Sequence, residues 1–215
     1  MVRYYPSFRE FADMKGIRVV RIATHPELMD KGLGSLALKR LCEEAVNEGF
    51  DWVGASFGAE KRLLNFWLKN EFVPLHISPM RNVISGEFSV IVVKPLSEKA
   101  ERIVREIHRE FKLRLLESLP DTYYNLDPEV AAQLLSVKRW SHLEKPELTP
   151  SQRERLMEYI RGSLAYESAC DVVKHILRAH FLSSGEARLK LEMKDEAKLI
   201  ARCLQCRSWD KTAEI

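Results

Sequence analysis

Residues 17–35 read IRVVRIATHPELMDKGLGS, and this stretch decides the fold of the first half of the chain. It opens with a β-branched run at residues 17–23, passes through the turn Lys31-Gly32-Leu33-Gly34, and becomes apolar-periodic from Ser35. This pattern predicts a buried strand, a tight turn and a helix. We expect the helix to end at Gly49, because glycine is the common residue just past a helix C-terminus.

Four further elements are predicted between residues 51 and 93. Asp51–Phe57 (DWVGASF) is a strand candidate, and Phe72–Ile77 and Phe88–Val93 are two more. A short helix is expected over Glu60–Asn70, where apolar side chains recur at helical spacing. Strands and helices thus alternate in this half of the chain, which indicates an α/β fold.

The second half changes to helical periodicity. Glu98 to Leu119 carries apolar residues on one helical face and is followed by Pro120. Asp127-Pro128 and Thr149-Pro150 each pair an N-cap residue with proline at the first helical position, which predicts two helix starts. Two more helices are expected, one around residues 169–177 and a last one from about Ala187.

The predicted fold class is therefore α/β followed by an all-α C-terminal domain. The change of period places the domain boundary at Pro95 to Ser97, which divides the chain into residues 1–96 and 97–215. The sequence contains neither an internal repeat nor a low-complexity tract.

Composition excludes several classes of function. The apolar stretches are interrupted within about ten residues, far short of the roughly 20 that a membrane helix needs. No apolar run follows Arg3, so a secretory signal is not visible and a cytoplasmic protein is expected. A net charge of +3 is too small to indicate a dedicated nucleic-acid-binding protein.

The four cysteines predict neither a disulfide framework nor a metal site. They are few and scattered for a chain of 215 residues. Cys203 and Cys206 form a CxxC pair, but a zinc site needs a second pair of ligands at short spacing. We expect Cys203 on the apolar face of the last helix and Cys206 near its end, with no bound metal.

The strand, glycine-bearing turn and helix around Gly32 and Gly34 are typical of an anion site. Glycine lets the backbone turn tightly and approach a ligand closely. The free amides of the helix start, together with about half a positive charge from the helix dipole, favour a phosphate group. By itself the pattern is weak, because a plain tight turn has the same sequence.

The residues on both sides of the turn help to distinguish an anion site from a plain turn. RIATHPELMDKGLGS at 21–35 resembles the coenzyme-A-binding motif of the GNAT superfamily, and it is more similar to the R-I-A-x-H-P block of the RNA cytidine acetyltransferases. Two later segments resemble the same family: DWVGASFG at 51–58 followed by LNFW at 64–67, and then FVP at 72–74. The resemblance covers roughly Ile17 to Leu96 in three ordered blocks, and the helical tail agrees by position and length.

The resemblance implies a partial, mixed GNAT-type sheet at residues 1–96, the C-terminal half of the acetyltransferase domain. In that fold two neighbouring strands splay apart and hold the pantetheine arm of acetyl-CoA between them. By similarity, the cofactor-binding residues are Ile22, Ala23, Thr24, Met29, Asp30, Lys31, Gly32, Leu33, Gly34, Ser35, Arg62 and Lys69. Taken alone, Ile22 to Thr24 also fit ordinary core, and Arg62 and Lys69 fit a solvated helix face.

Three features depart from the family pattern. Met29 stands where the superfamily usually has Gln or Arg, although only backbone is needed there. Asn70-Glu71 replaces the expected small residue and glycine, so the short helix lacks the glycine that usually forms its C-cap. The sixteen residues before Ile17 cannot supply the earlier GNAT strands, and the family's helicase module is not in this sequence. A separate chain that supplies both is one expectation.

The implied reaction is acetylation of the exocyclic amine of a cytidine in tRNA or rRNA. The catalytic residues stay unassigned, with His25 and Ser56 as candidates beside their ordinary roles in a turn and a strand. Lys138, Arg139 and Trp140 combine charge with a stacking surface and are candidates for RNA contact, with an ordinary helix surface as the alternative. Two other functions remain open: a GNAT enzyme acting on a small amine or a protein, and a non-catalytic binding module.

Overall fold

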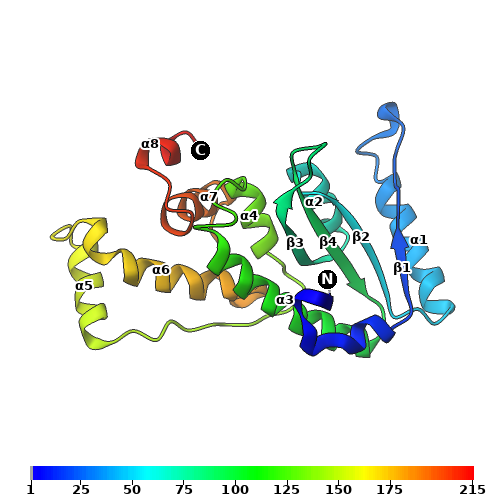
Figure 1. Ribbon diagram of the computed structural model, residues 1–215, viewed down its shortest axis with the longest axis horizontal. Coiled ribbons are helices and arrows are strands. Elements are labelled where there is room, and N and C mark those ends of the chain that lie inside the picture. The colour runs from blue at the N-terminus through cyan, green and yellow to red at the C-terminus, as the bar shows by residue number, and fades with distance from the viewer. Residues whose placement is uncertain (1) are drawn as a thin grey trace. The chain divides into compact units, whose positions relative to one another are not determined.

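The computed structural model describes residues 2–215, which form two compact units. One ends at Phe111 and the other begins at Lys112, so the division falls inside helix α3 (Glu98–Ser118) (Figure 1). The first half of α3 belongs to the sheet unit, because Ile103 and Ile107 are buried and the His108 ring nitrogen Nδ1 lies 2.8 Å from the Pro74 carbonyl oxygen. The boundary predicted between residues 96 and 97 marks the end of the sheet and stays a prediction about domain organisation.

The first unit is built on one mixed four-stranded sheet with the order β1-β2-β4-β3. β1 runs parallel to β2, while β4 is antiparallel to both β2 and β3. The strands are β1 (Gly16–Val19), β2 (Trp52–Gly58), β3 (Val73–Arg81) and β4 (Phe88–Pro95). All four were predicted from sequence, and the mixed sheet confirms the α/β fold class.

β1 is shorter than predicted, and its early end determines where it parts from β2. It pairs with β2 over four residues only, from Gly16 opposite Trp52 to Val19 opposite Ala55. β2 continues for three more residues, paired on its other side with β4 as far as Gly58 opposite Ser89. The two parallel strands therefore separate after Val19, and Figure 1 shows the chain leaving β1 away from β2.

Two helices follow the strands as the sequence predicts. α1 (Leu33–Asn47) buries Leu38, Cys42 and Ala45 and ends just before Gly49, whose φ of 71° is the left-handed conformation of a helix stop. α2 (Lys61–Lys69) buries Leu64 and Trp67, and the Glu60 carboxylate caps it by accepting from the amides of Arg62 and Leu63. Short 3-10 turns at Val2–Tyr4, Pro6–Asp13 and Pro26–Leu28 complete this unit.

The C-terminus of α2 has the conformation that glycine usually provides. Glu71 adopts φ 66°, its amide donates to the Leu68 carbonyl at 3.0 Å, and the Phe72 amide donates to the Trp67 carbonyl at 3.1 Å. These two bonds form a Schellman motif, and the Trp67 and Phe72 rings pack edge to face against each other as that motif favours. The helix is therefore capped despite Asn70-Glu71, with a non-glycine residue in a strained position.

Glu71→Gly is expected to stabilise the sheet unit by about 0.5–1 kcal/mol, because relief of left-handed strain exceeds the loss of an ion pair with Lys94 whose Glu71 side chain is exposed. Glu71→Ala keeps the strain and loses the ion pair, so it should be slightly less stable than the wild type. Thermal unfolding followed by circular dichroism gives the order Gly, Glu, Ala. A glycine variant less stable than the wild type would contradict this assignment of strain.

The second unit is helical. Asp127 and Thr149 cap α4 and α5 as predicted, and Thr149 forms a full capping box with Gln152. Its elements after α3 are α4 (Pro128–Leu135), α5 (Pro150–Ile160), α6 (Tyr166–Leu182), a 3-10 turn (Gly185–Ala187), α7 (Met193–Leu199), a π-helical turn (Ile200–Leu204) and α8 (Trp209–Ala213). The all-α character predicted for this part of the chain is confirmed.

The prediction of a last helix from about Ala187 was wrong at its start. The helix begins only at Met193, and the chain is extended before it because the Arg188 side chain turns inward. One Arg188 nitrogen donates to the Leu135 carbonyl at 2.7 Å and another to Glu196 at 2.5 Å. Beyond the π-helical turn, α8 adds a short helix that the sequence did not predict.

A buried charged cluster holds the helical unit together. Glu196 pairs with Arg188, and the His180 ring nitrogen Nε2 lies 3.2 Å from the same carboxylate. Burial raises the pKa of Glu196, but His180 and Arg188 outweigh burial and hold it below its usual value. Nearby, Lys112 is 2% exposed and donates to the carbonyls of Leu182 and Ser183 at the end of α6, while burial lowers its pKa to about 7.

Among residues 2–215, none of the helices combines the length and the apolar character that a bilayer crossing requires. Within the same range, no group of three or more His, Cys, Asp or Glu side chains is arranged to hold a metal ion. The four cysteines are free thiols, with Cys203 buried and Cys206 exposed after the π-helical turn.

Candidate functional site

β1 and β2 move apart at one edge of the sheet, beyond Val19 and Ala55. Because the two strands are parallel, their C-terminal ends lie at the same edge. The segment 20–32 leaves β1 there and leads into α1, and the turn of the β3–β4 hairpin also lies there, since β4 begins beside the end of β2. Most of the residues that the sequence singled out in this half of the chain lie on these segments.

The start of α1 presents unpaired amides. Gly32 occupies the N-cap position with φ 80°, a conformation that side chains disfavour, and no side chain caps the helix. In the part of the chain that the structure describes, the amides of Gly32, Leu33, Gly34 and Ser35 donate no hydrogen bond to the protein. Free amides at a helix N-terminus, with the positive end of the dipole behind them, are suited to bind an anion.

Gly34 is placed by close packing rather than by an unusual conformation. A Cβ atom at this position would lie 3.1 Å from the Phe66 ring of α2 and 3.8 Å from the Thr24 hydroxyl oxygen. The absence of a side chain therefore lets the first turn of α1 approach α2. It also leaves the amides of that turn open to a ligand.

Ile22, Ala23 and Thr24 lie beyond the paired part of β1. Ala23 is exposed and the other two are half-buried, so the interpretation of these residues as plain core was wrong. Among the described residues, their backbone groups make no backbone hydrogen bond. An extended segment with free N–H and C=O groups, beside a neighbouring strand that has moved away, can pair with an extended ligand.

The structure brings Arg62 to the glycine turn but not Lys69. The Arg62 guanidinium donates to the Asp30 carboxylate at 3.1 Å and lies 3.8 Å from the Met29 sulfur. Both members of this ion pair are largely exposed, so it holds the turn and α2 together only weakly. Lys69 is exposed at the other end of α2, about 10 Å along the helix axis.

The two catalytic candidates lie near the same edge. His25 is exposed and begins the 3-10 turn Pro26–Leu28, with its carbonyl accepting from the Leu28 amide. Ser56 is exposed on β2 at the first position beyond the pairing with β1. The sequence did not single out Glu87, whose carboxylate lies against Gly58 at the end of β2. Only the register of β2 with β4 reveals that contact, since the two residues are 29 positions apart.

The RNA-contact candidates of the helical unit are arranged differently from the expectation. Lys138, Arg139 and Trp140 lie in the segment that follows α4, not on a helix surface, and Lys138 is exposed while the other two are half-buried. Two other arginines of this unit are engaged within the protein: Arg155 forms two hydrogen bonds with the Asp171 carboxylate, and Arg161 pairs with Glu158. A role for the 138–140 segment in RNA contact stays a prediction.

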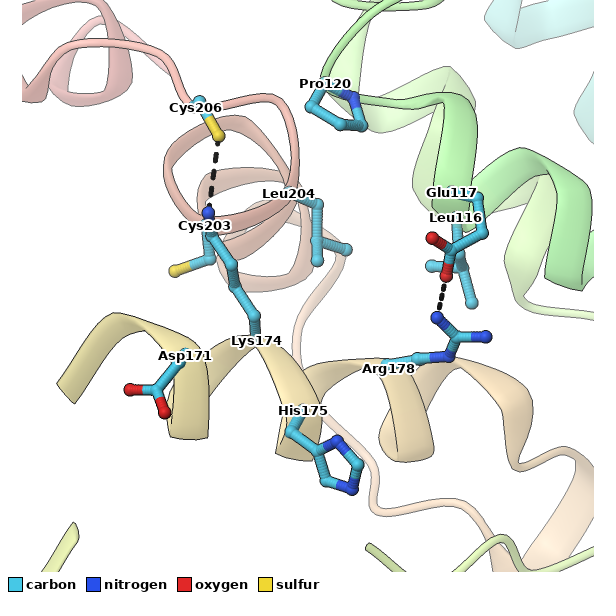
Figure 2. Close-up of a pocket in the computed structure, with 10 residues that line it drawn as sticks. All are labelled: Leu116, Glu117, Pro120, Asp171, Lys174, His175, Arg178, Cys203, Leu204 and Cys206. Carbon is cyan, nitrogen blue, oxygen red and sulfur yellow. Dashed lines mark hydrogen bonds and ion pairs between the residues drawn. The ribbon is translucent and has the colours of Figure 1, made fainter. Parts of the chain in front are cut away.

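A separate pocket lies within the helical unit, between the end of α3, α6 and the segment that contains Cys203 and Cys206 (Figure 2). Its cationic side chains have partners: Arg178 pairs with Glu117, and the Lys174 ammonium lies 3.6 Å from the Cys206 sulfur. The pocket shares no residue with the glycine turn. The sheet edge is therefore the better candidate for cofactor chemistry.

Comparison with known proteins relates the sequence to acetyltransferases. A profile of the family GNAT acetyltransferase 2 matches residues 3–45 and 38–97. The tRNA(Met) cytidine acetyltransferase of Thermofilum pendens is 48% identical over the whole chain, and those of Pyrococcus abyssi and Methanopyrus kandleri are each 44% identical over it. The chain spans about a quarter of the length of these relatives, namely 26%, 26% and 25%. Residues 3–97 therefore match the GNAT acetyltransferase 2 family, and the chain is similar along its whole length to a portion of the tRNA(Met) cytidine acetyltransferases.

Proposed function

We propose that the sheet unit binds acetyl-CoA between β1 and β2 and that the protein transfers the acetyl group to the exocyclic amine of a cytidine in RNA. The observation that carries this proposal is the set of four consecutive unpaired amides from Gly32 to Ser35. A phosphate or diphosphate group suits such an array of amides.

The residues at the sheet edge fit the cofactor in two places. The backbone from Met29 to Ser35 would hold the pyrophosphate, with the Arg62 guanidinium beside the same turn. The free backbone groups of Ile22 to Thr24 would pair with the amides of the pantetheine arm, which brings its end towards the opening beside Ser56. When bound, the cofactor supplies an acetyl thioester.

The acceptor side demands accurate positioning. The amine of cytidine is a weak nucleophile, because its lone pair is delocalised into the ring, so holding it close to the thioester should supply much of the rate. A group near the opening must also take the proton that the amine loses. His25, Ser56 and the Glu87 carboxylate are the polar side chains near this edge that we propose to test for that role.

RNA is proposed as the acceptor because the relatives are named tRNA(Met) cytidine acetyltransferases. The outer edge of β1 bears no partner strand among the described residues, since β1 is the end strand of the sheet. We propose that further strands of the acetyltransferase domain add at this edge. They would come from another segment of polypeptide, in this chain or in a separate one that also carries the helicase module.

Two measurements test the function. Calorimetric titration of the chain with acetyl-CoA should give saturable binding, and an absence of heat at sub-millimolar protein would contradict the cofactor site. The chain should then be incubated with acetyl-CoA and a tRNA(Met) transcript, alone and with the remaining portion of the Pyrococcus abyssi relative. Acetylcytidine in the nuclease digest supports the proposal, whereas acetylated protein or small amines without acetylcytidine would point to a different acceptor.

A further inference from the structure

The β3–β4 hairpin carries three exposed aliphatic side chains at its turn, which we call the apolar tip: Met80, Val83 and Ile84. Their exposed fractions are 76%, 101% and 98%, so Val83 and Ile84 bury nothing within this structure. Single exposed apolar residues are ordinary on protein surfaces. Three within the five residues 80–84 are less ordinary, and groups of exposed apolar side chains commonly mark contact surfaces.

The apolar tip is held rigidly. The Asn82 side-chain oxygen accepts from the amides of Ile84 and Ser85 at 2.8 and 3.2 Å. The Arg81 guanidinium donates to the Gly86 carbonyl at 2.7 Å and lies over the Phe88 ring, 4.5 Å from its centroid. A turn fixed in this way loses little entropy when it binds a partner.

The strand below the apolar tip is bulged. Ile77 lies opposite Val90 and Arg81 opposite Phe88, so β3 has three residues between these pairs where β4 has one. The Ser78 hydroxyl accepts from the Ser89 amide at 2.8 Å and so replaces a ladder bond that the bulge removes. Bulges commonly re-aim a strand end next to a functional site.

The position of the apolar tip connects it to the proposed reaction. It lies at the sheet edge where β1 and β2 separate, because β4 starts beside Gly58 at the end of β2. Residues 79–86 contain one charged side chain, that of Arg81, so the turn carries positive charge and no carboxylate. Glu87, the nearest acid, lies back against Gly58. The turn itself therefore presents no negative charge to an approaching polyanion.

Acetylation of a cytidine within RNA requires an element of the protein that gives access to the base. The exocyclic amine of a stacked cytidine lies in the plane of the base, and enzymes that modify bases move the target out of the stack. Proteins that unstack bases commonly insert aliphatic wedges between them. We propose that the apolar tip is the wedge that contacts the bases next to the target cytidine, an inference that rests on the proposed function.

The test compares tRNA binding with cofactor binding on the whole chain. Val83→Ser/Ile84→Ser should weaken the affinity for a labelled tRNA(Met) transcript about tenfold, measured by fluorescence anisotropy, because the apolar contacts of the wedge with the bases are lost. Its affinity for acetyl-CoA and its melting temperature should not change, because both side chains are fully exposed. The matched control, Val46→Ser/Ile160→Ser, removes two exposed aliphatic residues elsewhere and should leave tRNA affinity unchanged.

A second variant reports contact directly. Ile84→Trp places an indole at the apolar tip, and its added fluorescence should be quenched by tRNA(Met) and not by acetyl-CoA. One outcome contradicts the wedge proposal alone: tRNA binds, but it neither quenches this indole nor binds less tightly to the double serine variant. The proposed function would then survive. If the chain binds no tRNA, the wedge is also wrong, and acetyl-CoA titration then decides separately whether the cofactor site stands.

Discussion

Replacing Glu196 with alanine should cost the helical unit about 3–5 kcal/mol of unfolding free energy, because it leaves the Arg188 guanidinium buried without its counter-ion. The two side chains are 7% and 8% exposed and their contact is 2.5 Å, so solvent cannot replace the carboxylate without opening the unit. The same substitution removes the partner of His180. Urea unfolding followed by circular dichroism, fitted with separate transitions for the two units, measures the loss.

Two controls distinguish a buried charge from a merely altered helix. Asp195→Ala removes the exposed acidic neighbour from the first turn of α7 and should cost at most about 1 kcal/mol. Arg188→Met/Glu196→Met removes both charges together and should recover most of the stability, because apolar residues of similar volume can replace a buried pair. A loss below 1 kcal/mol in Glu196→Ala would show that this pair does not hold the unit together.

The position of Arg188 explains why the sequence misplaced the last helix. Leu189 and Met193 fit the helical period that predicted a start near Ala187, yet both are exposed in the structure. What decides the start is a contact with the Leu135 carbonyl, 53 residues away, which no local pattern contains. By contrast, the caps at Asp127 and Thr149 act within three residues of themselves and were predicted correctly.

The candidate site likewise has parts that local sequence predicts and parts that depend on distant contacts. Gly32, Gly34 and the start of α1 could be predicted, because the strand, turn and helix are consecutive in sequence. The end of β1 at Val19 could not, since the β-branched run continues to Ile22 and only the pairing with β2 shows where the strands part. Glu87 beside Gly58 and the exposed turn at Val83 likewise depend on strand register.

Gly34→Val should weaken acetyl-CoA binding at least about 100-fold, or about 2.7 kcal/mol, while the chain still folds. A branched side chain on the first turn of α1 would cover the amides of Leu33 to Ser35 and keep a diphosphate from approaching them. It would also press on the Phe66 ring, at an overpacking cost of about 1–3 kcal/mol. Calorimetric titration measures the affinity, and circular dichroism confirms the fold.

Further variants separate the two effects of that substitution. Ser35→Ala keeps every amide and removes only a hydroxyl, so its affinity should stay within about threefold of the wild type, as expected when the backbone supplies the contact. Gly34→Val/Phe66→Ala makes room for the valine and should recover stability without recovering acetyl-CoA affinity. If affinity returned with the packing, α1 would have been displaced by Phe66, and the unpaired amides of its first turn would not be what holds the cofactor.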